Sequence, residues 1–235
     1  MADATDLDAA TPVGELVALF SPDAADALTG LRRDHQPTGR ADVVCEVKRT
    51  GGTTPDVRII VSNIENAEID LRGARVAIAD CRGRVEYTRL DGRGAVRFHD
   101  FDAVVSGNGG EAGRLSLDGM AQPPEGSPVG LLLGLTGARW EHPLVREAFR
   151  SFAPSGIVDV LESTDSAGDF SLNLRMSPGA PDGPNRVIGT LAPRRWTGMV
   201  HGVPLALEFE AGSSVEFTQD GGTLKNVRLS APLWH

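Results

Sequence analysis

A two-residue alternation of apolar with other side chains, interrupted at short intervals by turns that contain glycine, is the feature that most constrains this chain. The pattern is clearest in residues 71–101, where Val76 and Ile78 alternate with alanines. Successive side chains of a β-strand point to opposite faces of a sheet, so this period predicts half-buried strands. Asp and Gly between the apolar runs are typical of tight turns. We therefore predict three short strands joined by turns at residues 80–83 and 91–94.

The composition of the whole chain supports many short strands. The 235 residues include 28 Gly and 15 Pro, and aromatic residues make up only 5%. Frequent Gly and Pro at turn-like spacing favour strands over long helices. A chain of this length has room for one large β domain or two small ones. The sequence thus predicts a mainly β protein, built as one or two antiparallel β-sandwiches, with a core of Val, Leu, Ile and Ala.

A short helical segment is predicted near the N-terminus. Thr11-Pro12 and Ser21-Pro22 are both helix start signals. We therefore expect a short helical hairpin, or one helix broken at Pro22, that ends near Arg33. Its apolar stripes are too short to be stable alone, so the segment must dock on its own domain or on a partner chain. The first stripe consists of Val13, Leu16, Val17 and Phe20, and the second of Ala24, Leu28 and Leu31.

One further helix is predicted in the middle of the chain, at residues 141–153. Pro143 falls in its first turn, and Pro154 and Gly156 are expected to end it. A strand is then predicted at residues 157–161. The face of this helix that is expected to be buried carries Leu144, Val145, Ala148, Phe149 and Phe152.

The Pro- and Gly-containing stretch at residues 119–128 is the best candidate for a linker. It divides the chain into parts of unequal length. The predicted organisation is a flexible or helical segment at 1–37, a first β domain or half at 38–118, the linker, and a second β domain or half at 129–235.

The central hairpins resemble a known family. The residues that carry the resemblance are Gly73-Ala74-Arg75-Val76, Asp80-x-x-Gly83 and Asp91-x-x-Gly94-x-Val96-x-Phe98. Asp165-x-x-Gly168 repeats the pattern 74 residues after Asp91. This layout resembles the prealbumin-like (carboxypeptidase regulatory-like) β-sandwich family. If this repeat is real, the chain is two related sandwiches or one sandwich of two halves; chance similarity between two hairpins is the alternative. Turn chemistry predicts positive φ at Gly94 and, by the same pattern, at Gly168.

Charge and hydropathy exclude several kinds of partner. The net charge is −9, and no basic stripe with interleaved aromatic residues occurs, which argues against binding of nucleic acid. The longest apolar run is far too short to span a membrane, and residues 1–20 lack the basic start of a secretory signal. Arg far outnumbers Lys, which is typical of a GC-rich bacterial genome. We therefore expect a cytoplasmic bacterial protein.

The two cysteines are too few for a disulfide scaffold or a zinc site. Cys45 and Cys81 both lie among strand signals, so we expect two free, partly buried thiols. No cofactor is predicted.

A weak candidate for a metal site is the run that contains His99, Asp100 and Asp102. Along a strand only the two aspartates would share a face, whereas a metal needs three or more converging ligands. No G-x-S-x-G nucleophile motif occurs. The three tryptophans, Trp140, Trp196 and Trp234, suit either a core or a surface that stacks on sugars.

These observations favour a non-catalytic binding, assembly or regulatory protein. The alternatives are an enzyme of unfamiliar type with a site between the two β halves, and a carbohydrate-binding module; a β-sandwich supports all three. A protein partner or self-association, including a homodimer, is expected. The predicted interaction residues are Val13, Leu16, Val17, Phe20, Leu233 and Trp234.

Overall fold

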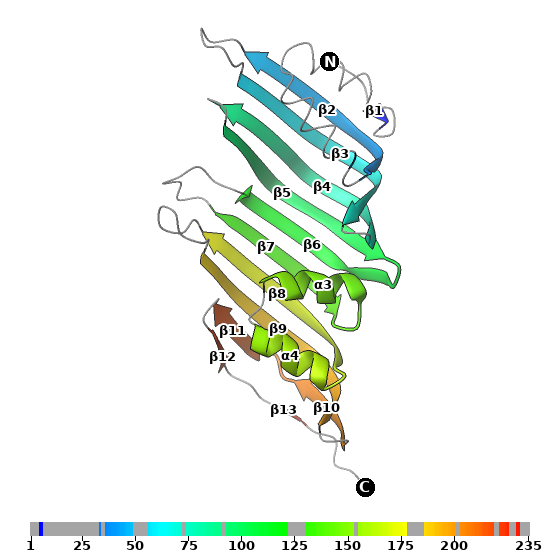
Figure 1. The fold of residues 1–235 in the computed structure, drawn as a ribbon, viewed down its shortest axis with the longest axis vertical. Coiled ribbons are helices and arrows are strands. Elements are labelled where there is room, and N and C mark those ends of the chain that lie inside the picture. The colour runs from blue at the N-terminus through cyan, green and yellow to red at the C-terminus, as the bar shows by residue number, and fades with distance from the viewer. Residues whose placement is uncertain are drawn as a thin grey trace.

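The computed structural model shows one long antiparallel sheet with two helices over part of one face (Figure 1). It describes residues 5–6, 33, 36–48, 56–71, 74–90, 93–121, 130–152, 155–177, 186–200, 203–218, 221–225 and 229–230. The predicted N-terminal helices and the predicted interaction residues at both ends of the chain lie outside these ranges.

The described strands follow one another in space largely as they do in sequence. From β1 to β10, each strand is hydrogen-bonded to the next one in sequence. Strand β13 pairs with β10, and β11 pairs with both β9 and β12. The strands are β1 (Thr5–Asp6), β2 (Thr38–Lys48), β3 (Asp56–Leu71), β4 (Ala74–Leu90), β5 (Arg93–Gly107), β6 (Gly110–Ala121), β7 (Leu131–Arg139), β8 (Ala167–Ser177), β9 (Arg186–Val200), β10 (Val203–Phe209), β11 (Ser214–Thr218), β12 (Gly221–Lys225) and β13 (Leu229–Ser230).

The mainly β, antiparallel class predicted from the sequence is confirmed. The layer arrangement differs, because the described strands form a single open sheet where the sequence predicted a sandwich. The first three residues of the predicted linker, 119–121, belong to β6, and residues 122–128 lie outside the described ranges. Strands β6 and β7 are adjacent in this sheet, and Met120 N donates to Gly130 O at 3.0 Å.

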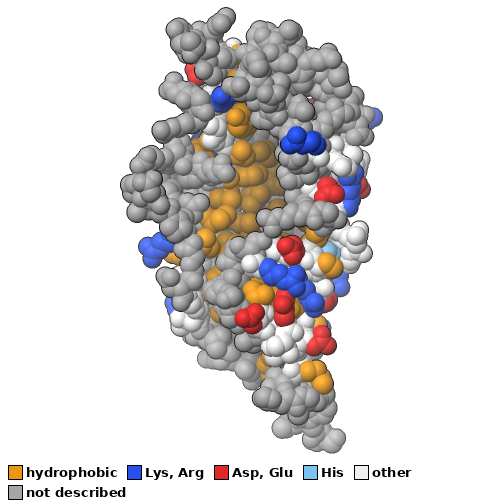
Figure 2. Space-filling model, viewed as in Figure 1, with side chains coloured by type: hydrophobic (Ala, Val, Ile, Leu, Met, Phe, Trp, Pro, Cys, Tyr) orange, Lys and Arg blue, Asp and Glu red, His pale blue; other side chains and the backbone are white. Residues whose placement is uncertain are grey.

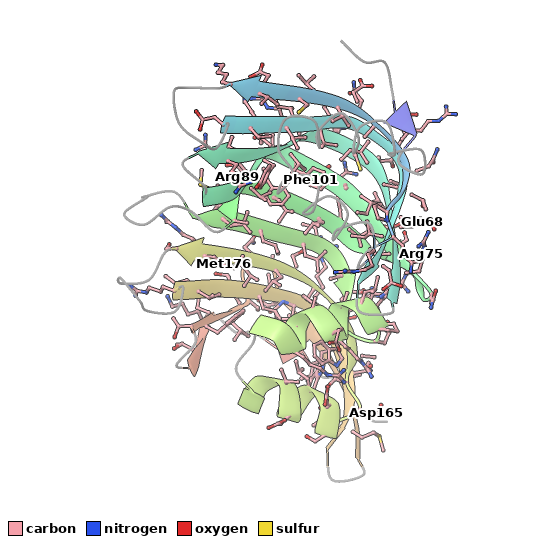
Figure 3. All side chains as sticks on the ribbon, turned by 45° about the horizontal axis from the view of Figure 1, so that its top comes forward. Glu68, Arg75, Arg89, Phe101, Asp165 and Met176 are labelled. Atoms are coloured by element: carbon pink, nitrogen blue, oxygen red, sulfur yellow. The ribbon has the colours of Figure 1, made fainter. Side chains whose placement is uncertain are left out.

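One predicted turn is a bulge inside a long strand. The chain turns between β4 and β5, where Leu90 pairs with Arg93, but residues 80–83 continue within β4. Asp80 and Gly83 do adopt the positive φ values, 50° and 81°, that turn chemistry favours. The ladders of β3, β4 and β5 all shift register at this level, so the neighbouring strands follow the irregularity and the strands bend (Figure 3).

The register places apolar side chains opposite one another on one face, strand after strand. Val61, Val85 and Phe98 form one such row across β3, β4 and β5. Leu117, Leu133 and Leu174 continue the apolar face across β6, β7 and β8. This face, called the apolar face below, therefore extends through both halves of the sheet.

Two helices cover the apolar face in the C-terminal half. They are α3 (Pro143–Phe152) and α4 (Ser155–Ser163), and they lie over the strands from β6 onward (Figure 1). Phe149 of α3 is 1% exposed and meets Trp140 edge-on, with ring centroids 5.2 Å apart. The buried core beneath the helices consists of Ala112, Ala138, Trp140, Val145, Phe149, Val158, Phe170, Leu172, Leu174 and Phe217.

The predicted mid-chain helix is confirmed as α3, although Ala148 is exposed where burial was expected. The strand predicted at 157–161 is wrong, because these residues belong to α4. Val158 is buried and Leu161 packs against the core, a spacing of three residues that suits a helix. A short apolar run does not distinguish a helix from a strand, and here the tertiary contacts decide.

The second predicted hairpin is also not formed. Asp165 has φ 46° and its N–H donates to Glu162 O at 3.3 Å, so it ends α4 rather than turning between strands. Gly168 then lies in β8 and is not at positive φ. The two D-x-x-G segments therefore occupy different structural contexts.

Candidate functional site

Each of the three weak metal candidates is engaged with a different group. His99 Nε2 lies 3.0 Å from Glu86 Oε2. Asp100 has φ 45°, and its N–H donates to the Asp118 carboxylate at 3.3 Å. Asp102 forms an ion pair with Arg114. Within the described part of the chain, no group of three or more His, Cys, Asp or Glu side chains is placed to hold a metal ion.

Glu86 is the centre of a polar cluster that sequence analysis missed. It is 9% exposed, and one carboxylate oxygen accepts a 2.7 Å hydrogen bond from Arg58 Nε while the other contacts His99. Arg58 also reaches Glu46 at 3.5 Å, so the cluster joins β2, β3, β4 and β5. The hydrogen bond from Arg58 holds the pKa of Glu86 below its usual value. The cluster ties strands together, and its members, 12 to 28 residues apart in pairs, give no local sequence signal.

A shallow depression of about 570 Å³ lies on the face opposite the helices, over β5 to β9. Gly134 forms part of its floor, because a Cβ there would come within 2.4 Å of Ser116 Oγ. The register aligns a row of polar residues across it, and exposed Leu132 and Ile188 flank the row. The row consists of Asp102, Ser116, Gly134, Asn173 and Thr190.

The depression offers hydrogen-bonding groups, but its chemistry does not single out a reaction or a sugar. Ser116 Oγ donates to Gly134 O at 3.5 Å, and no base is positioned on it among the described residues. No Trp or Tyr is among its lining residues. Of the predicted sugar-stacking residues, Trp140 is buried in the core, Trp196 is half-buried, and Trp234 lies outside the described residues.

Cys45 and Cys81 are both free and half-buried, as predicted. Burial raises the pKa of each thiol. A thiol with a raised pKa is a poor nucleophile at neutral pH, so neither cysteine has the character of a catalytic one.

A further surface lies on the apolar face, in the strands beyond the reach of α3. Hydrophobic side chains form a continuous band there that runs lengthwise across the strands (Figure 2). Part of this band, called the apolar trough below, is half-buried and lies outside the core cluster under the helices. The trough consists of Val85 and Tyr87 of β4, Val96 and Phe98 of β5, and Leu115 and Leu117 of β6.

The register explains why these six side chains share a face. Tyr87 pairs with Val96, and Val85 pairs with Phe98. Directly paired residues of antiparallel strands point to the same side of the sheet. The ring of Phe98 also meets that of buried Phe101 edge-on, with centroids 6.1 Å apart, near the middle of the sheet (Figure 3). The only polar side-chain atom in the trough is the hydroxyl of Tyr87.

Comparison with family models, with curated proteins and with solved structures gives no match to this chain. Neither described helix combines the length and the apolar character needed to cross a membrane.

Proposed function

We propose that this is a non-catalytic binding protein that holds a long alkyl or acyl chain in the apolar trough. The observation that carries the proposal is the continuous band of hydrophobic side chains across the strands between β3 and β7 (Figure 2). Contiguous apolar surface of this kind on a protein marks a site of interaction with another molecule.

The shape of the band supports an elongated ligand. Across β4, β5 and β6 there are two interstrand spacings of about 4.8 Å, which gives a track roughly 10 Å long between the outer two strands. The side chains along it are mainly Val, Leu and Phe, and they supply contact area without hydrogen-bonding specificity. An extended hydrocarbon chain fits such a surface, because it needs apolar contact along its length and no polar partner.

The chemistry of the trough supports binding rather than catalysis. Among its six residues, Tyr87 carries the only group that can donate or accept a proton. An acyl-transfer or hydrolytic site needs a nucleophile, a base and an oxyanion donor that converge on one point. The ligand is therefore held and released unchanged.

Assembly is the second candidate function, and the edge of β2 favours it. Among the described strands, β1 pairs with β2 only at Arg40 and Ala41, so residues 42–48 have no partner strand on that side. An unpaired edge is a template for another strand. A second copy that packed its sheet on the apolar face would also complete the predicted β-sandwich.

The test of ligand binding uses a fluorescent fatty acid, an anthroyloxy-labelled stearate, titrated into the full-length protein. Phe98→Asp places a charge in the trough, and burying it unpaired costs more than about 1.4 kcal/mol, so Kd should rise at least tenfold. The matched control is Leu132→Asp, at a side chain 51% exposed on the opposite face, which should leave Kd unchanged.

Val96→Thr is a second, milder trough variant, and it should weaken binding by a smaller factor while the far-UV circular dichroism stays that of the parent. Failure of the parent to bind the probe would overturn the proposal. Equal Kd values for the parent, Phe98→Asp and Leu132→Asp would place the binding elsewhere. If the parent forms a dimer that the probe does not affect, and Phe98→Asp abolishes that dimer, then assembly is the function of this face.

A further inference from the structure

We infer that two copies of this chain pair edge to edge through β2, antiparallel, about a two-fold axis that passes between their Cys45 residues. The stretch that pairs, residues 42–48, is called the β2 edge below. The inference gives the assembly that this edge favours a partner, a second copy, and a register. It uses no residue of the trough, so it does not depend on the ligand proposed above.

Strand β2 is paired along its whole length on one side only. It pairs with β3 from Thr38 to Lys48, and it lies near one end of the sheet (Figure 1). On its other side β1 pairs at Arg40 and Ala41, and no strand that the structure describes continues beside residues 42–48. Unpaired N–H and C=O groups along an edge are a template for another strand. The β2 edge is within the usual range of strand lengths, about 3–10 residues, so it is long enough to pair.

The β2 edge lacks two of the devices that keep natural edges from pairing, which are bulges and proline. The register shifts of the β2–β3 ladder lie between Thr38 and Asp42, and from Asp42 to Lys48 the register is unbroken. No proline occurs within residues 42–48. Val44, in the middle of this stretch, is 45% exposed on the face opposite the trough. A regular edge that carries an exposed apolar side chain suits the addition of a strand.

Two-fold symmetry restricts the register of such a pair. In a continuous antiparallel sheet the axis is perpendicular to the sheet, so one residue of β2 must lie opposite the same residue of the second copy. The midpoint of residues 42–48 is Cys45, and the register centred there pairs every residue of the β2 edge. Val43 then lies opposite Val47 of the second copy, and the apolar faces of both sheets lie on the same side.

Charge favours this register over its neighbours. Asp42 lies opposite Lys48 of the second copy, and the axis repeats the pair. Opposite charges across antiparallel strands stabilise the pairing, and like charges destabilise it. Moving the axis one residue earlier would place Asp42 opposite Glu46, and moving it one residue later would place the two Glu46 carboxylates opposite each other. In the proposed register Glu46 lies opposite Val44, and its charge already has Arg58 of its own chain at 3.5 Å.

The same register brings two thiols together. Cys45 is free and half-buried in the single chain. Directly opposed residues of antiparallel strands have Cα atoms about 4.5–5.5 Å apart, which is within the span of about 4.4–6.8 Å that a disulfide bridges. The thiol of Cys45 therefore reports on the register, because an added oxidant joins the two chains only when their Cys45 residues are opposed.

The first test is oxidation of the full-length protein with copper–phenanthroline in a Cys81→Ser background. The oxidant removes two electrons and two protons from the opposed thiols, and a covalent dimer should appear on a non-reducing gel at low protein concentration. The matched control carries Cys45→Ser and Val47→Cys, which keeps one thiol on the same face of β2. Val47 lies opposite Val43, so this control should give at least about tenfold less dimer.

The second test changes the charges. Asp42→Lys and Lys48→Glu each place like charges opposite each other twice, and each should raise the Kd of dimer formation about tenfold, measured by analytical ultracentrifugation. The variant that carries both substitutions should dimerise like the parent. An equimolar mixture of the two single variants should form a heterodimer, because every opposed pair in it is complementary.

Three results would overturn the inference. One is as much covalent dimer from the Val47→Cys control as from Cys45, and another is an equal Kd of dimer formation for the parent and both single charge variants. The third is a dimer that Phe98→Asp abolishes and Lys48→Glu does not, which would place the contact between copies on the trough. Binding of the stearate probe tests the proposed function separately, since the charge variants leave the trough unchanged.

Discussion

The two halves of the sheet present the same apolar face in different surroundings. Under α3 and α4, Phe149, Phe170 and Phe217 lie within one buried cluster, with Phe149 at 6.3 and 6.4 Å from the other two rings. In the N-terminal half, Phe98 and Leu117 on the same face are half-buried and lie outside that cluster. The C-terminal half thus buries its apolar face in its own core, whereas the N-terminal half keeps part of the same face outside that core.

The largest expected difference between the halves comes from the same substitution made in each. Phe149→Ala should lower the free energy of unfolding by about 3–5 kcal/mol, because it leaves a cavity in a closed core. Phe98→Ala should cost about 1–2 kcal/mol, because the ring is half-buried. Urea unfolding followed by tryptophan fluorescence measures both values. Similar costs would remove the distinction between the half that forms the core and the half that we propose binds a ligand.

Two glycines, one in each half of the sheet, differ in how closely the backbone of a neighbouring strand approaches them. Neither Gly94 nor Gly168 has positive φ, so the reason given for them from sequence is wrong. At Gly168 a Cβ would lie 2.2 Å from the Arg195 carbonyl oxygen, whereas at Gly94 it would lie 2.9 Å from the hydroxyl of Tyr87, the far end of a side chain.

Gly168→Ala should therefore cost about 1–3 kcal/mol, because a backbone ladder must shift, while Gly94→Ala should cost less than about 1 kcal/mol. Thermal unfolding of the two variants checks the order. An equal or reversed order would show that the N-terminal half is packed as tightly as the C-terminal half.

The polar cluster in the N-terminal half should make that half sensitive to acid. The pKa of Glu86 is lowered in the folded state, so its contribution to stability is present above the ordinary value of 4.5 and is lost as the pH falls through the lower folded pKa. Glu86→Gln should be less stable than the parent by about 1 kcal/mol at pH 7, and the difference should shrink below pH 4.5.

Urea midpoints at pH 7 and pH 3.5 measure this effect. The control is Glu162→Gln, which removes the partner of exposed Arg150 between the two helices and should change the midpoint less. If the difference in urea midpoint between Glu86→Gln and the parent is the same at both pH values, the lowered pKa of Glu86 does not contribute to stability.

The smallest expected effect concerns the two cysteines. Thiol titration of the denatured protein without reductant should find both Cys45 and Cys81 free. In the native protein both should react slowly at pH 7 and faster as the pH rises above 9, because burial raises the pKa of each thiol. Finding no free thiol would show a bridge that the structure does not contain.

Some of the fold follows from short-range pattern alone. The two-residue period placed Val85 with Tyr87, and Val96 with Phe98, on common faces, and the register agrees. The Asp-Gly pair at residues 91–92 predicted the tight connection between β4 and β5. Proline in the first turn and a single apolar stripe predicted α3. These features depend on neighbours within a few residues, which a sequence contains in full.

Other features depend on what lies beside or above a segment. Asp80 and Gly83 have the conformations of turn residues, yet whether they turn the chain or bulge a strand depends on β3 and β5 shifting with them. Residues 157–161 are helical because their apolar side chains meet the core under α3. The Glu86 cluster brings together residues from four strands.

The sequence by itself determined which side chains share a face, where α3 begins and where the chain makes a tight hairpin, because period and turn chemistry act locally. Only the tertiary structure decided that the strands form one open sheet in place of two facing sheets. An alternating strand requires that its apolar side be covered, but the alternation does not state whether a helix, a second sheet or a ligand provides the cover. That choice separates the half of this sheet that is a core from the half that we propose binds.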